Sequence, residues 1–232
     1  MQPGLDALIA ATATFVATHI LLASAPLRGP LAARLGERGF MLLYSAVALA
    51  TFVWMIDAWR DAPFVGLWPG GGGLDWLPVA VMPVALLLAV CAFTTASPTL
   101  PAGSEGMISA RNPAPGIFRV TRHPFLWSVV LWAGAHIVAR GDLASLVMMG
   151  GMAGLAVAGM FHIDRKKEAR LGADWGPILM TTSILPFRAL AEGRARMDWA
   201  GIGWWRPLVA LALYVILIWL HPYVTGMPAW PA

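Results

Sequence analysis

Five histidines are the side chains best suited to chemistry, because imidazole can carry a proton or coordinate a metal ion near neutral pH. They are His19, His123, His136, His162 and His221. His123 stands in an Arg-His-Pro sequence before an apolar stretch, and His136 lies inside that stretch. An imidazole buried among apolar groups costs free energy unless it has a partner. The sequence therefore raises the question of what His19 and His136 bind.

The composition is that of a membrane protein. Of 232 residues, 59% are hydrophobic and only 12% are charged, and the mean hydropathy is +0.69. Soluble domains carry about one charged residue in four. The net charge of +4 comes from basic residues gathered in particular loops, which indicates membrane orientation rather than nucleic-acid binding. The single cysteine, Cys91, excludes an internal disulfide and is expected to pack in an apolar segment.

The apolar pattern predicts an all-α bundle of about six transmembrane helices, forming a single domain over residues 1–232. The spans are expected at about Leu5–Ala25, Phe40–Trp59, Trp76–Ala96, Pro124–Val138, Leu143–Ile163 and Pro207–His221. The stretch from Ala173 to Trp205 is too polar to span and predicts short helices on the membrane surface. Its aromatic side chains are expected to dip into lipid: Trp175, Phe187, Trp199, Trp204 and Trp205.

Basic and non-basic loops alternate along these six spans. The loops after the first, third and fifth spans hold the arginine and lysine clusters: Arg28, Arg34 and Arg38; Arg111, Arg119 and Arg122; and the run from Arg165 to Arg196. The positive-inside rule then places these three loops in the cytoplasm and both termini in the periplasm. The predicted location is the bacterial inner membrane.

Only His19 and His136 fall clearly at hydrocarbon depth. Two interpretations remain open from the residues alone. The rings can be satisfied by hydrogen bonds to their neighbours, or they can be axial ligands of a haem iron held between two helices. His123 and His162, matched in depth at the cytoplasmic end of the fourth and fifth spans, are the second candidate pair.

Several motifs together resemble the NnrU family over roughly residues 5–222. They are Thr18-His19-Ile20, Arg119-Val-Thr-Arg-His-Pro124, Leu131-Trp132-Ala-Gly-Ala-His136, Asp164-Arg165-Lys166-Lys167 and Ser183-Ile-Leu-Pro-Phe187. The family is similar to the plant 15-cis-zeta-carotene isomerases. The resemblance implies a haem b whose iron is bound by His19 and His136, with a hydrophobic polyene as substrate. It does not decide whether this chain is an enzyme; if it is one, a haem-dependent cis–trans isomerase is expected.

Two other functions stay open. NnrU proteins are associated with denitrification, so the resemblance also fits a haem protein that handles nitric oxide. Arg122-His123-Pro124, followed by Glu168 and Trp175, is similar to the isoprenylcysteine carboxyl methyltransferases, which use S-adenosylmethionine. Leu126 and Ser128 depart from that pattern, which has tyrosine and glycine there.

A polar cluster is expected where the fourth and fifth spans meet the cytoplasm. The almost absent connection between these spans predicts a tight antiparallel hairpin. Arg122, His123, Asp164 and Arg165 should then lie close together at its open end. Such a cluster, with Arg122 and His123 as cofactor-binding residues, could hold haem propionates or anchor the hairpin.

Overall fold

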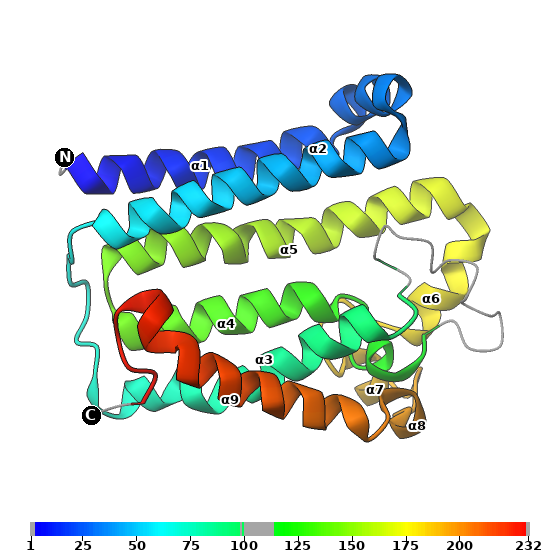
Figure 1. Ribbon diagram of the computed structural model, residues 1–232. Coiled ribbons are helices and arrows are strands. Elements are labelled where there is room, and N and C mark those ends of the chain that lie inside the picture. The colour runs from blue at the N-terminus through cyan, green and yellow to red at the C-terminus, as the bar shows by residue number, and fades with distance from the viewer. Residues whose placement is uncertain (1–2, 98, 100–113, 231–232) are drawn as a thin grey trace.

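The computed structural model describes residues 3–97, 99 and 114–230, and Arg111 of the third predicted loop lies outside them (Figure 1). The elements are α1 (Pro3–Ala23), α2 (Ala25–Asp61), η1 (Gly72–Asp75), α3 (Trp76–Thr94), η3 (Gly116–Arg119), α4 (Pro124–Arg140), α5 (Leu143–Leu171), η4 (Gly172–Trp175), α6 (Gly176–Thr181), α7 (Arg188–Ala191), α8 (Trp199–Ile202) and α9 (Trp205–Thr225). The all-α prediction is confirmed.

The long helices pack in a row that does not follow chain order. α2 packs on α1, α1 on α5, α5 on α4, α4 on α3, and α3 on α9. Both chain ends lie at one end of the bundle, and α6, α7 and α8 lie at the other (Figure 1). We refer to these as the terminal end and the α6–α8 end. Helix α5 is thus the element that joins the N-terminal hairpin to the rest.

Within the part of the chain that the structure describes, five helices are long and apolar enough to cross a membrane, namely α1, α2, α3, α5 and α9. They coincide with five of the six predicted spans. The predicted fourth span is α4, an apolar helix of 17 residues. At 1.5 Å per residue it is about 25 Å long, slightly less than a hydrocarbon core. The chain is a multi-pass helical membrane protein.

Three helices extend beyond the predicted spans. α2 begins at Ala25, but its backbone leaves the helical conformation at Gly36, where a φ of 71° suits a residue without a Cβ, so its second segment starts near the predicted Phe40. α5 runs past Ile163 to Leu171, because Arg165–Glu168 and Ala169 are good helix formers. α9 runs past His221-Pro222 to Thr225. The loop predicted after the first span is therefore largely helical.

The stretch between α5 and α9 forms short helices, as predicted. Phe187, Trp199 and Trp204 are more than half exposed, so they are placed to contact lipid headgroups. Trp175 is only 1% exposed, so the prediction that it dips into lipid was wrong. It comes directly after α5 in η4, which packs back on α5.

At the terminal end, the turn between α4 and α5 is tied to the loop after α2. The backbone N–H groups of Leu67 and Leu143 donate to the carbonyls of Gly141 and Val65 at 2.7 and 2.9 Å. Asp142 caps α5 by accepting a hydrogen bond from the Ser145 N–H at 2.9 Å. These bonds fix the hairpin that carries His136.

Candidate functional site

His19 lies one turn before the end of α1, on the side of the α6–α8 end. Its Nδ1 donates a hydrogen bond of 2.7 Å to the carbonyl of Phe15. The Phe15 ring lies 4.2 Å from the imidazole between centroids, and the Tyr44 ring of α2 meets it edge-on at 5.6 Å. The imidazole is therefore oriented by its own helix and enclosed by two aromatic rings.

His136 has the same arrangement on α4. Its Nδ1 donates a hydrogen bond of 2.7 Å to the carbonyl of Trp132, and the Trp132 ring lies 5.5 Å away between centroids. Arg140 lies on the next turn of α4, and its Nη1 contacts Sδ of Met227, whose carbonyl bonds to Nδ1 of His221 of α9. This imidazole is also held by the turn that precedes it.

Each ring makes the same kind of hydrogen bond, and this bond fixes its tautomer. A carbonyl oxygen only accepts, so Nδ1 of each neutral ring carries the proton and Nε2 carries the free lone pair. Among the described residues, no hydrogen bond is found for Nε2 of either His19 or His136. A donated Nδ1–H with an open Nε2 is the arrangement of imidazoles that ligate metals, because the bond orients the ring and raises its basicity.

The two imidazoles lie at different heights but lean toward each other. Thr12 of α1 faces Gly151 of α5, and Leu126 of α4 faces Gly159. At 1.5 Å of rise per residue, these two contacts place the Cα atoms of His19 and His136 roughly 14 Å apart along the bundle axis. Each ring bonds to a carbonyl one turn nearer the N-terminus of its helix, and the two helices run in opposite directions. Both rings are thereby displaced toward the same intermediate height.

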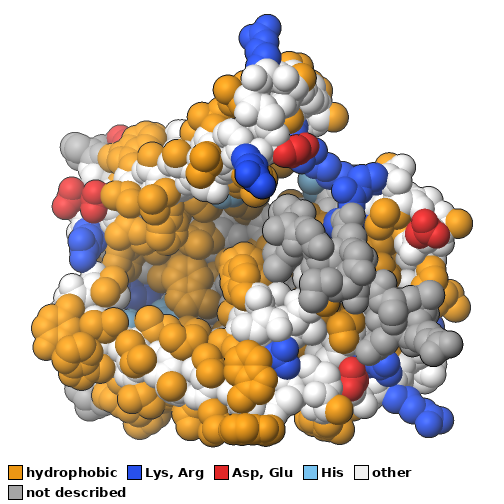
Figure 2. Space-filling view, turned by 45° about the vertical axis from the view of Figure 1, so that its right-hand side comes forward, with side chains coloured by type: hydrophobic (Ala, Val, Ile, Leu, Met, Phe, Trp, Pro, Cys, Tyr) orange, Lys and Arg blue, Asp and Glu red, His pale blue; other side chains and the backbone are white. Residues whose placement is uncertain are grey.

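One apolar cluster connects the surroundings of both histidines. Phe15, the ring neighbour of His19, belongs to it as a buried residue, and Trp132, the ring neighbour of His136, packs against it. Met55 of α2 and Met148 of α5 complete its centre. Figure 2 shows a recess lined by hydrophobic side chains between the α1–α2 hairpin and α9, with histidine atoms visible at its margins. The two imidazoles thus border one apolar region of the bundle.

A polar cluster closes the α6–α8 end of the α4–α5 hairpin. Asp164 places one carboxylate oxygen 2.8 Å from Nε2 of His123 and the other 3.0 Å from Nε of Arg122. The Nε–H of Arg122 has no acceptor in line among the described residues, so charge rather than a hydrogen bond joins it to Asp164. Arg122 Nη1 also reaches the Thr182 hydroxyl at 3.5 Å. The predicted proximity of Arg122, His123 and Asp164 is confirmed.

Burial dominates the electrostatics of this cluster. Desolvation lowers the pKa of Arg122, Asp164 opposes that shift, and the positive charge of Arg194 adds to it. The side chains of Arg122 and Asp164 are only 9% and 14% exposed. Their charges are committed to each other, which favours the anchoring role over the binding of propionates. Arg165 and His162 are exposed on α5 and make no described contact with the cluster.

Sequence reasoning missed three neighbours of the histidines. Arg140 could have been found, because it lies four residues after His136 on the same helix face. Tyr44 and His221 could not, because the packing of α2 on α1 and of α9 on α3 carries no local signal. His123 was predicted to join the polar cluster, and its side chain does so by binding Asp164 rather than by capping α4.

Fold and site together define a multi-pass helical membrane protein in which two oriented imidazoles lie beside one apolar cluster. The NnrU protein family profile matches residues 7–229. The chain belongs to the NnrU family.

Two plant proteins are similar to this chain. The chloroplastic 15-cis-zeta-carotene isomerase of Arabidopsis thaliana is 27% identical over 171 residues, which are 69% of this chain and 44% of that protein. The protein of the same name from Zea mays is 30% identical over 82 residues, 35% of this chain and 22% of that protein. The matched region is less than half of either relative. No solved structure matches this chain.

Proposed function

We propose that this protein binds one haem b beside the apolar cluster that adjoins α1 and α4, and that His19 and His136 would hold its iron. The observation that carries the proposal is the paired geometry of the two imidazoles. Each donates Nδ1–H to the carbonyl one turn earlier and leaves Nε2 open, and both lean toward one height. Two imidazoles are a sufficient protein ligand set for a porphyrin iron, which needs axial ligands only.

The residues around the histidines fit such a group. Phe15, Tyr44 and Trp132 offer aromatic surface beside the rings, and the apolar cluster between them excludes water. Both Nδ1–H bonds prevent the rings from turning and keep the lone pairs directed away from their helices. A bound haem supplies one-electron redox chemistry at its iron. The protein contributes ligand orientation and an apolar environment.

The reaction we propose is cis–trans isomerisation of a double bond in a long polyene. The two similar plant proteins carry the name of a 15-cis-zeta-carotene isomerase, and family membership extends over nearly the whole chain. An extended hydrocarbon would reach the recess from the lipid, since the faces that border it are apolar (Figure 2). We further propose that the protein resides in a bacterial inner membrane.

Absorption spectroscopy of the purified protein tests the cofactor. We expect a Soret band with one haem per chain. His19→Ala and His136→Ala should each shift or abolish that band, because each removes one axial ligand. His162→Ala is the matched control, since His162 is exposed on α5 and should not change the spectrum. Wild-type spectra and haem content in both ligand variants would show that the assignment is wrong.

The reaction has a separate test. Cells that make 15-cis-zeta-carotene and express this chain should accumulate the isomer in which the 15-cis double bond has become trans, as measured by chromatography. His136→Ala should prevent this accumulation. A protein that contains haem and binds nitric oxide but leaves the polyene unchanged would instead fit a role in nitric-oxide handling.

A further inference from the structure

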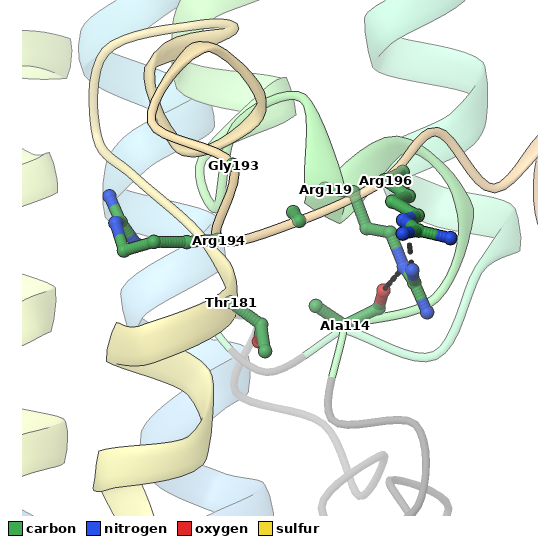
Figure 3. A pocket seen from close by; sticks show the side chains of 7 residues that line it. Ala114, Arg119, Thr181, Gly193, Arg194 and Arg196 are labelled. Carbon is green, nitrogen blue, oxygen red and sulfur yellow. Dashed lines mark hydrogen bonds between the residues drawn. The ribbon is translucent and has the colours of Figure 1, made fainter.

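A pocket at the α6–α8 end lies apart from the histidines and has no assigned role. It has a volume of about 280 Å³ and is lined by Ala114, Arg119, Thr181, Gly193, Arg194, Ala195 and Arg196 (Figure 3). Segments from both sides of the α4–α5 hairpin thus form one cavity. Three of its seven lining residues are arginines and none is acidic.

The three arginines divide into one structural residue and one pair. Arg194 points away from the other two (Figure 3). Its Nη1 donates to the carbonyls of Met180 and Thr182 at 2.8 and 3.0 Å, and its Nη2 lies 2.6 Å from Glu192. Arg194 therefore stabilises the end of α6. The arginines available to a ligand in the pocket are Arg119 and Arg196.

Arg119 and Arg196 lie side by side at the pocket. Arg119 is fixed by two backbone carbonyls: its Nε donates to Ala114 and its Nη1 to Arg196, both at 3.1 Å (Figure 3). The side chain of Arg196 is exposed, and no hydrogen bond or ion pair of its guanidinium is found among the described residues. Two neighbouring guanidinium groups repel each other, and an anion bound between them would relieve that repulsion.

The fold presents this pair at a loop that glycine makes possible. Gly193 has a φ of 71° and terminates the turn after α7, where the N–H groups of Arg194 and Ala195 both donate to the carbonyl of Ala189. This turn sends Arg194 toward α6 and Arg196 toward η3. The backbone thereby places Arg196 beside Arg119, whose side chain is held in turn by the Arg196 carbonyl.

We propose that this pocket binds the phosphate of an anionic phospholipid headgroup. Guanidinium forks match phosphate oxygens in geometry as well as charge. The surroundings favour a lipid as the source, because large apolar side chains are exposed on the same segments. Met180 precedes the pocket residue Thr181, and Trp199 and Trp204 follow Arg196; all three are at least 65% exposed. Such side chains lie at headgroup level, which is where lipid phosphates are found.

Native mass spectrometry of the purified full-length chain tests the proposal. With equal amounts of phosphatidylglycerol and phosphatidylcholine added, the wild type should retain phosphatidylglycerol preferentially. Arg196→Gln should reduce that retention roughly five-fold, because it removes one charged fork from an exposed site and leaves the fold intact. Arg34→Gln is the matched control: it removes an equal charge from exposed α2 and should retain lipid like the wild type.

Two outcomes would overturn the proposal. Equal retention of phosphatidylglycerol by Arg196→Gln and the wild type would show that the pocket does not hold the lipid. Displacement of phosphatidylglycerol by millimolar inorganic phosphate would show that the site takes free phosphate. Arg196→Lys, which keeps the charge but loses the fork, should retain an intermediate amount if the headgroup is bound as proposed.

Discussion

At the scale of single residues, Asp164 is the carboxylate on which two buried cationic or protonatable groups depend. It serves Arg122 and His123 at once. We predict that Asp164→Asn lowers the free energy of unfolding by about 3 kcal/mol, because it leaves the Arg122 charge buried without a counter-charge. Thermal unfolding in mild detergent measures the effect.

The matched control for that substitution is Glu192→Gln. Glu192 also serves two arginines, Arg188 and Arg194, but it does so at the surface. We expect its melting temperature to stay near that of the wild type. The double variant Arg122→Met with Asp164→Leu should recover part of the lost stability, since it removes the unpaired charge as well. A wild-type melting temperature in Asp164→Asn would contradict the anchoring role.

The candidate histidines were open to prediction from the sequence, but their geometry was not. Depth along predicted helices separated His19 and His136 from the other three. That Asp164 would pair with both Arg122 and His123 could be anticipated only as proximity. Which side chain took which oxygen depends on the register between α4 and α5, and the burial of Trp175 depends on how η4 folds back on α5. Register follows from packing in three dimensions, which local sequence patterns do not encode.

At the scale of elements, Asp142 makes the stability of the α4–α5 hairpin depend on pH. Burial raises its pKa, but hydrogen bonds from the Ser145 N–H and hydroxyl, together with Arg140, lower it by more, so the net shift is downward. A carboxylate with a depressed pKa stabilises the fold fully above its unfolded value of about 3.9. That stability is lost as pH falls below this value through the native pKa.

We therefore predict that the melting temperature of the wild type decreases when the pH is lowered below about 4. The melting temperature of Asp142→Asn should decrease less steeply over the same pH range. At neutral pH, Asp142→Ala should cost about 0.5–2 kcal/mol through loss of the α5 cap. Melting temperatures of the three proteins across this pH range measure both effects. Parallel pH profiles for Asp142→Asn and the wild type would exclude Asp142 as the group responsible.

The contact between α1 and α5 depends on one glycine. A Cβ at Gly151 would lie 2.5 Å from Cγ2 of Thr12, whereas a Cβ at Gly154 would have no atom within 4 Å. Gly151→Ala should destabilise the protein by about 1–3 kcal/mol, because Thr12 is β-branched and cannot yield without changing rotamer. Gly154→Ala should be neutral. Unfolding of the two alanine variants, one turn apart on the same helix, makes the comparison.

If haem spans α1 and α4, Gly151→Ala should also reduce haem content relative to Gly154→Ala, because it moves α1 away from α5. Haem loss in both variants would point to a general loss of folding. Equal and complete retention in both would contradict a site that requires close approach of α1.

At the scale of the whole molecule, most of the architecture followed from the sequence. Apolar length located the six helices, and glycine, proline and charge located the connections. The order of packing did not follow, because α5 inserts between α1 and α4 although three helices separate it from α1 in the chain. These helices have similar hydrophobic patterns, so the pattern does not identify which helices pack together. The shapes of the helix surfaces determine the neighbours.

The arrangement of the termini gives a topological prediction. Both lie at the same end of the bundle, opposite α6–α8 (Figure 1). Combined with the alternation of basic loops, this predicts that reporters fused to either terminus are periplasmic. A reporter inserted at Gly193 should be cytoplasmic. Opposite locations for the two termini would contradict an even number of spans.

The central place of α5 has a consequence for biosynthesis. The α1–α2 hairpin leaves the ribosome first, but its partner helix begins only at Leu143. At about 5–20 residues per second, translation of the intervening chain takes several seconds or more. During that time the Thr12 face of α1 has no helix against it. The N-terminal hairpin must therefore wait in the membrane, and insertion factors that shelter polar helix faces would act on this protein at that stage.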